Sequence, residues 1–177
     1  HKKVKGEFFL KLCIKHLPQE KNNLVVNRTL SFLRIIYSTY LDEGSRQLIQ
    51  DDLERFCINM VNNKAEGKNK KSYFNTLLSI CSSPKSCSYL SSVLKGEQDL
   101  PEDVTINEHD KISIAFNLVL RDTNVYEDMK AYIMKTVKNK DLLDRFEYVY
   151  PSLSGDKHVR DSVFNALLVR ENRVNEV

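Results

Sequence analysis

Histidine is the side chain that most often binds metals or moves protons near neutral pH, and this chain has four, His1, His16, His109 and His158. None of them belongs to a His-Glu-x-x-His pair, which would place two imidazoles on one helix face around zinc. The chain also lacks a Gly-x-Ser-x-Gly nucleophile turn and a glycine-rich phosphate loop. We therefore expect no catalytic, cofactor-binding or metal-binding residue in this chain.

Paired carboxylates are the second kind of residue that could carry chemistry. They occur at Asp51-Asp52 and at Asp141 with Asp144. Acid–base catalysis needs two such groups that face one cleft and differ in pKa. These four lie between apolar positions of predicted helices, a pattern that favours solvated helix faces over an active site.

Four cysteines, Cys13, Cys57, Cys81 and Cys87, show neither Cys-x-x-Cys spacing nor a histidine at metal-ligand distance in the sequence. In a helical chain we expect most of them to be small buried apolar residues. Because their number is even, two disulfides remain the alternative in an oxidising compartment.

Composition limits the partners that we expect. The 177 residues carry a net charge of only +3, which favours neither nucleic acid nor a membrane surface as a partner. No apolar run approaches the roughly 18–20 residues of a membrane span, so none is expected. Four lysines in the loop 63–71 predict a solvated loop, with binding to phosphate or acidic protein as the alternative. The chain begins at His1 rather than at Met, and we take it as a fragment of a larger protein.

Apolar residues recur at steps of three and four along most of the chain, which predicts helices that each bury one stripe. Val26, Leu30, Leu33, Tyr37 and Tyr40 form the clearest stripe. The first five helices are expected over 3–17, 25–44, 45–62, 72–82 and 83–96, and four more between 105 and 167, broken at Asp122, Lys138 and Pro151.

Several residues are typical of helix ends. Gly44 is expected to close the second helix, and Ser83-Pro84 to begin the fifth. Thr105 and Glu108 match a capping box for the sixth helix. Ser154 or Asp156 is expected to cap the ninth, with Val159, Val163, Ala166 and Leu167 facing inward.

These elements predict an all-α fold. Short polar loops join successive helices, so neighbouring helices should be antiparallel. We expect a single helical domain over 1–177, built as an irregular HEAT-like array of about nine antiparallel helices that forms a curved bundle or superhelix. The loop 96–105 is expected to be a soft point, that is, a flexible connection between the two halves of the domain.

The C-terminal segment has the most distinctive sequence. It contains a Phe-x-x-x-x-Pro-Ser-Leu-Ser run over 146–154, then VRDSVF over 159–164. Its polar positions are candidates for an interface or the lining of a cavity, or alternatively for locking the last two hairpins together. They are Arg160, Asp161, Asn172, Arg173 and Glu176.

This segment, 146–176, is similar to the C-terminal helical domain of the aminopeptidase N family of zinc metallopeptidases, especially its bacterial members. The stretch 104–120 also resembles that domain. The resemblance implies that a separate catalytic domain of the parent protein binds zinc and that this chain is not itself the enzyme. The helical domain would pack on that catalytic domain and limit which peptides reach its active site.

Two other functions stay open on the sequence. A free-standing helical-repeat scaffold would bind another protein through one face of the array. Binding of nucleic acid through the basic loop is a weaker alternative and would depend steeply on salt concentration. The presence of a His-Glu-x-x-His segment upstream in the natural reading frame would distinguish the aminopeptidase from the scaffold.

Overall fold

The computed structural model describes residues 5–63 and 69–172, and every regular element within them is helical. The predicted all-α fold is therefore confirmed. The chain divides into two compact units, His1–Thr105 and Ile106–Val177. The division falls at the end of the loop that we expected to be a soft point. Among the described residues, no helix combines the length and the apolar character that crossing a membrane requires.

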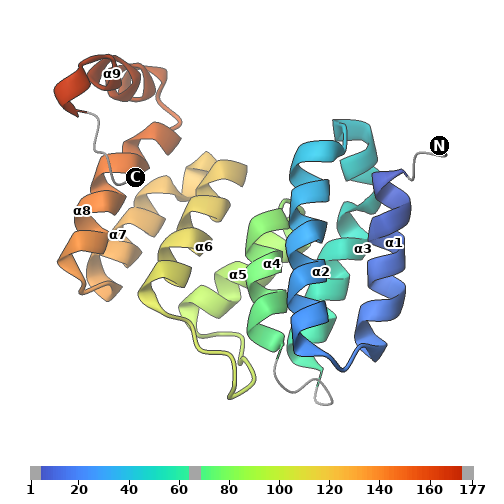
Figure 1. Cartoon of the computed structure of the whole chain (residues 1–177). Coiled ribbons are helices and arrows are strands. Elements are labelled where there is room, and N and C mark those ends of the chain that lie inside the picture. Colours follow the sequence, from blue (N-terminus) through green and yellow to red (C-terminus); the bar gives the residue numbers. More distant parts are fainter. Residues whose placement is uncertain (1–4, 64–68, 173–177) are drawn as a thin grey trace. The chain divides into compact units, whose positions relative to one another are not determined.

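The first unit is built on two helical hairpins (Figure 1). The helices α1 to α4 run alternately up and down, because short loops join each to the next. α1 packs on α2 and α3, and α4 packs on the same two helices. The elements are α1 (Gly6–His16), η1 (Leu17–Gln19), α2 (Asn23–Ile35), η2 (Ile36–Tyr40), α3 (Glu43–Asn62), α4 (Lys70–Ile80) and α5 (Pro84–Lys95).

The α3–α4 hairpin forms the most extensive contact of the first unit. Leu53 on α3 and Leu77 on α4 are fully buried, and the rings of Phe56 and Tyr73 meet edge to face with centroids 5.7 Å apart. Phe74 is also fully buried. Each such side chain contributes roughly 1.5–3 kcal/mol when it leaves water, so this hairpin is a main source of the unit's stability.

A π-helical turn, η2, ends the second helix, where the sequence predicts an uninterrupted α-helix. It closes with a hydrogen bond from the Leu41 amide to the Ile36 carbonyl, 3.1 Å long. The turn brings Leu41 against the start of α1. There a Cβ on Gly6 would lie 2.8 Å from Leu41 Cδ2, which is too close for any other residue without a shift.

The boundary between the second and third helices differs from the prediction. Gly44 lies in the first turn of α3 rather than at the end of the preceding helix. Asp42 sets this start, because its carboxylate accepts a hydrogen bond from the Ser45 amide at 2.8 Å. That hydrogen bond lowers the pKa of Asp42 below its usual value. The predicted start of α5 is confirmed, with Ser83 as the cap and Pro84 as the first helical residue.

A buried carboxylate joins α3 to the start of α5. Glu54 is 1% exposed and accepts hydrogen bonds from the amides of Ser82, at 2.7 Å, and Ser83, at 3.2 Å. It also accepts from both serine hydroxyls. The N-terminus of a helix favours negative charge, which explains why a carboxylate is stable at this buried position.

The second unit contains four α-helices within its described residues. α6 packs on α7 and α8. Its elements are α6 (Glu108–Arg121), η3 (Thr123–Val125), α7 (Tyr126–Thr136), α8 (Lys140–Val149), η4 (Tyr150–Leu153), α9 (Lys157–Leu168) and η5 (Arg170–Asn172).

An aromatic cluster forms the core of this unit. Tyr150 is 1% exposed, and its ring lies 4.4 Å from that of Phe146 and 4.5 Å from that of Tyr126, measured between centroids. Its hydroxyl donates a 2.7 Å hydrogen bond to the Tyr126 carbonyl. Burial raises the pKa of Tyr150 well above its usual value, and the Tyr126 and Glu127 side chains add to the effect.

The capping box of α6 lies two residues beyond the predicted one. Asn107 and Asp110 exchange hydrogen bonds between side chain and backbone, each 2.9 Å long. Thr105 belongs instead to the preceding extended segment, where its carbonyl accepts a hydrogen bond from Lys71 Nζ at 2.8 Å. The prediction of Thr105 and Glu108 as the box was therefore wrong, and the Glu108 carboxylate instead accepts hydrogen bonds from the amides of Lys138, at 2.8 Å, and Asn139, at 3.2 Å.

Candidate functional site

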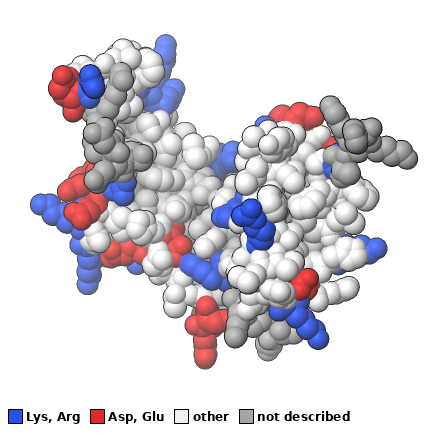
Figure 2. All heavy atoms as spheres, in the orientation of Figure 1, with Lys and Arg blue, Asp and Glu red and all other residues white. Residues whose placement is uncertain are grey.

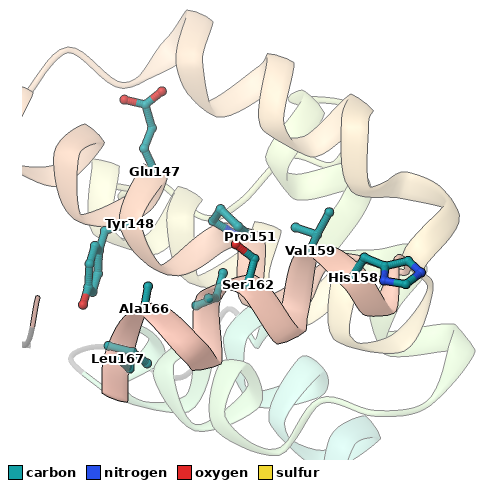
Figure 3. A pocket seen from close by; sticks show the side chains of 9 residues that line it. Glu147, Tyr148, Pro151, His158, Val159, Ser162, Ala166 and Leu167 are labelled. Atoms are coloured by element: carbon teal, nitrogen blue, oxygen red, sulfur yellow. The ribbon is translucent and has the colours of Figure 1, made fainter. Parts of the chain in front are cut away.

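The second unit has an open groove of about 580 Å³ between α9, η4 and the end of α8. In Figure 3, Tyr148 and Pro151 face the side of α9 that carries Val159, Ser162 and Ala166. The groove is mostly apolar, so it suits an apolar side chain of another polypeptide better than a charged small molecule. Its lining residues are Glu147, Tyr148, Pro151, His158, Val159, Ser162, Val163, Ala166 and Leu167.

The sequence predicts that four apolar residues of α9 are buried, and the structure differs on this point. They do share one face, but none of the helix's residues is buried, and Val159 and Leu167 remain 36% and 38% exposed. α9 packs mainly on the short turns η4 and η5, which offer too little surface to cover it. Its apolar face therefore lines a groove.

Three hydrogen bonds fix the start of α9. Asp156 caps the helix by accepting a 2.8 Å hydrogen bond from the His158 amide, which confirms one of the two predicted caps. The other predicted cap, Ser154, accepts from the Asp156 amide at 3.1 Å. Arg160 Nη1 donates a 2.5 Å hydrogen bond to the Ser154 carbonyl. These contacts orient α9 relative to η4.

The predicted interface residues are only partly brought together. Arg160 and Asp161 are both exposed on α9, and neither lines the groove. The backbone of Asn172 lies in η5, whereas its side chain, together with Arg173 and Glu176, lies outside the described residues. Of the two members whose side chains the structure describes, Arg160 has a role in the contact with Ser154.

The sequence analysis did not identify Glu147 and Tyr148, which line the α8 side of the groove. Pro151 could have indicated them, because it ends α8 and turns the chain. Residues three and four positions before such a turn lie on the last helical turn, beside the returning chain. His158, which we assigned no chemistry, also lies at the groove and supplies one of its few polar groups.

The first unit has a second groove, of about 450 Å³, between α1 and α2. Leu12 and Val25 on its walls are 40% and 44% exposed, and Phe32 nearby on α2 is 45% exposed. Exposed apolar side chains that gather on two adjacent helices are typical of a surface that another element covers. The lining residues are Phe9, Leu12, Cys13, His16, Leu17, Glu20, Val25 and Thr29.

Two ionisable side chains, His16 and Glu20, lie among the residues that line this α1–α2 groove. The Glu20 carboxylate already accepts a 2.7 Å hydrogen bond from the Asn22 amide. Arg28 precedes Thr29 of the lining on α2, and its guanidinium lies 4.8 Å from the centre of the Phe32 ring. The groove therefore offers a mostly apolar surface between two helices.

The other charged residues that the sequence suggested as binding or catalytic residues either contact their own unit or are exposed to solvent. Lys70 Nζ lies 3.0 Å from Asp103 Oδ1, and Lys71 Nζ lies 5.0 Å from the centre of the Phe74 ring. Two of the four loop lysines thus contact their own unit. Asp51, Asp52, Asp141 and Asp144 are all exposed, as expected. On the face drawn in Figure 2, basic and acidic side chains are interspersed, so neither sign gathers into one patch.

The part of the chain that the structure describes holds no group of three or more His, Cys, Asp or Glu placed to bind a metal ion. Comparisons of the chain with protein families, with curated proteins and with solved structures found no match. We therefore infer its function from the two grooves and from the sequence of residues 146–176.

Proposed function

We propose that this chain is the non-catalytic C-terminal helical domain of an aminopeptidase N-type zinc peptidase. In this proposal it packs on the catalytic domain of its parent protein and limits which peptides reach the active site. One observation carries the proposal. The segment whose sequence resembles that family, 146–176, includes the end of α8, η4 and α9, where apolar side chains line an open groove instead of a core.

The exposure of α9 supports a packing role. Phe164 is 65% exposed and Leu168 is 60% exposed, and both lie outside the groove lining. α9 thus carries apolar side chains on two sides with none of them buried. Each large apolar side chain that a second domain covered would contribute roughly 1.5–3 kcal/mol to the association, which makes α9 a suitable docking element.

The proposed contribution to peptide selection is geometric and electrostatic. Zinc and the catalytic groups would belong to the parent's catalytic domain, and we assign no metal ligand to this chain. Asp161 and Arg160 would lie near the interface that α9 forms, together with Asn172, Arg173 and Glu176. The domain would act on peptide substrates indirectly, by narrowing the path to the active site.

The test begins with the natural reading frame. If it encodes a His-Glu-x-x-His segment upstream, that catalytic part and this chain can be produced as separate polypeptides and mixed. We expect a stable complex by size-exclusion chromatography, and Phe164→Asp should weaken it at least about tenfold because it places a charge in an apolar contact. Leu48→Asp is the matched control, since Leu48 is 80% exposed on α3.

Three outcomes would contradict the proposal. They are a reading frame without that motif, equal effects of the two variants on the complex, and metal-dependent release of N-terminal residues by the purified 177-residue chain alone. The last would show that the chain itself is the enzyme.

A free-standing scaffold that binds a partner protein is the second candidate, and the α1–α2 groove favours it. An apolar floor between two helices accepts the apolar side of an amphipathic helix. The partner that fits is therefore an amphipathic helix, which would place its apolar side against Leu12 and Val25.

A designed peptide tests this second candidate. The probe is an amphipathic helix with leucines at i, i+3, i+4 and i+7 and polar residues elsewhere, labelled for fluorescence anisotropy. We expect it to bind at least about tenfold more tightly than the same peptide with glutamines in place of the leucines. Val25→Glu should abolish binding and Leu48→Glu should not. Equal affinity of the two peptides, or no effect of Val25→Glu, would exclude this groove.

A further inference from the structure

Two of the four thiols lie in contact with each other. Cys81 follows the last residue of α4, and Cys87 lies near the start of α5. Their Sγ atoms are 3.8 Å apart, the distance of two sulfur atoms in van der Waals contact. Cys81 is 1% exposed, whereas Cys87 is half-buried, so a reagent in solution reaches Cys87 first.

Hydrogen bonds to Glu54 on α3 hold the segment between the two cysteines in place. The buried carboxylate of Glu54 binds the Ser82 and Ser83 amides. Ser83 in turn caps α5 by accepting from the Ser86 amide at 3.3 Å. Because these bonds fix the backbone of the turn whatever the state of the thiols, rotation of the two side chains is the movement that would bring the sulfur atoms to bonding distance.

We propose that Cys81 and Cys87 form a reversible disulfide, with a low-molecular-weight disulfide such as oxidised glutathione as the oxidant. The Cys87 thiolate attacks one sulfur of the oxidant, which forms a mixed disulfide and expels one glutathione thiolate. The Cys81 thiolate then attacks Cys87 Sγ, which forms the internal disulfide and expels the second glutathione thiolate. Two protein thiols are oxidised and one oxidised glutathione is reduced to two thiols, so the exchange balances.

The other two cysteines show why this reactivity is specific to the pair. Cys13 and Cys57 lie on α1 and α3 and are 4% and 0% exposed. Burial raises the pKa of Cys13 to about 11 and that of Cys57 higher still. The thiolate is the reactive form, so both remain inert at neutral pH and serve as internal controls.

The disulfide would fasten the end of α4 to the start of α5. Residues 81–87 form the corner between these helices, and a covalent link there restricts the unfolded chain more than the folded one. Oxidised protein should therefore unfold at a higher temperature than reduced protein. This property belongs to the first unit alone and does not depend on the proposed function.

Trypsin offers a direct readout, because Lys85 lies between the two cysteines. After equilibration of the native chain in buffers of reduced and oxidised glutathione, we expect a loss of two hydrogen atoms in intact mass. Digestion without reductant should then give the peptides 72–85 and 86–95 joined as one species. Reduction should separate them and restore the original mass.

Variants complete the test. Cys87→Ser is expected to abolish the joined peptide, whereas Cys13→Ser should retain it; Cys87 is the better site to change because it is only half-buried. In the reduced protein, Cys87 should react with iodoacetamide at least about tenfold faster than Cys13. Three results would overturn the proposal. They are a glutathione adduct on Cys87 that never resolves, joined peptides that contain Cys13 or Cys57, and oxidation only after unfolding in urea.

Discussion

The α3–α4 hairpin and α9 have similar sequence patterns, but most apolar side chains of the hairpin are buried and those of α9 are not. Both show apolar residues at steps of three and four. α4 buries most of its length, with Phe74 fully buried, whereas α9 buries none of its residues and leaves Phe164 65% exposed. Periodicity identifies which face of a helix is apolar, but it does not identify whether the same chain covers that face.

The difference lies in what each helix packs against. α3 and α4 contact each other along the hairpin, and α1 and α2 lie against them. α9 packs mainly on the short turns η4 and η5. A helix with an uncovered apolar face gains free energy only when something else covers it, so the first region stabilises its unit and the second is available for association.

The largest expected effect on stability comes from replacing a phenylalanine in each of the two regions by alanine. Phe74→Ala should lower the free energy of unfolding by about 3–5 kcal/mol, because it leaves a cavity in a packed core. Phe164→Ala should change it by less than about 0.5 kcal/mol, as expected for an exposed side chain. Chemical denaturation followed by circular dichroism measures both. Similar losses in the two variants would show that α9 is covered after all.

The second largest effect on stability is expected from Glu54, which joins α3 of the hairpin to the start of α5. Glu54→Ala removes the acceptor of two backbone amides and is expected to cost about 3 kcal/mol. Glu54→Gln keeps one acceptor oxygen and should cost less. Asp52→Ala is the matched control on the same helix, since the Asp52 side chain is 60% exposed. If Asp52→Ala proved as harmful as Glu54→Ala, the anchor would have no special role.

Alkaline pH should weaken the first unit through its buried thiols. The pKa of Cys13 is raised from 9.0 to about 11 by burial. As pH rises through this window, the unfolded chain loses the thiol proton before the folded chain does, so stability present below pH 9 is progressively lost. One such group lowers the free energy of unfolding by up to about 1.4 kcal/mol per pH unit.

The Cys13→Ala variant isolates this contribution from those of Cys57 and Tyr150, whose pKa values burial also raises. Denaturation curves at pH 8, 9, 10 and 11 should show a shallower decline for the variant than for the wild type. Parallel declines would mean that the Cys13 thiol ionises equally in both states.

The smallest expected effect concerns the attachment of α9. Arg160→Ala removes the hydrogen bond to the Ser154 carbonyl and should change global stability by no more than about 1 kcal/mol. The amides of α9 should nevertheless exchange with solvent faster, which hydrogen exchange with mass spectrometry detects. Asp161→Ala, one position along the helix, should leave the exchange unchanged. Protection of α9 that survived Arg160→Ala would show that apolar contacts alone hold it.

Local signals predicted much of the fold. Ser83-Pro84 begins α5 as expected, because the cap and the first-turn proline depend on neighbouring residues only. The capping box was placed two residues early because Thr105 with Glu108 and Asn107 with Asp110 have the same spacing. In the structure the Glu108 carboxylate accepts hydrogen bonds from the Lys138 and Asn139 amides, 30 and 31 residues away in the sequence. Tertiary contacts of this kind are invisible in a local pattern.

The candidate site was less predictable than the fold. Arg160 was identified from its place in a distinctive segment, yet its contact with Ser154 depends on how the chain turns after Pro151. Glu147 and Tyr148 lie on α8 and line the groove only because α9 returns beside them. A groove forms between two elements that lie side by side in the fold. An apolar stripe in the sequence describes one helix and does not predict which other element lies beside it.

The π-helical turn at 36–40 has a consequence for the tolerance of the chain to changes in length. A π turn holds one residue more than the α-helical turn it replaces. Deleting Ser38, an exposed residue, would convert the π turn into an α-helical turn. Because the wider turn holds the extra residue, Leu41 would keep about the same position against Gly6. A deletion within α2 itself would instead rotate every following residue of the helix by about 100° around its axis. The chain should therefore tolerate the loss of one residue at 36–40 better than the loss of one residue in α2.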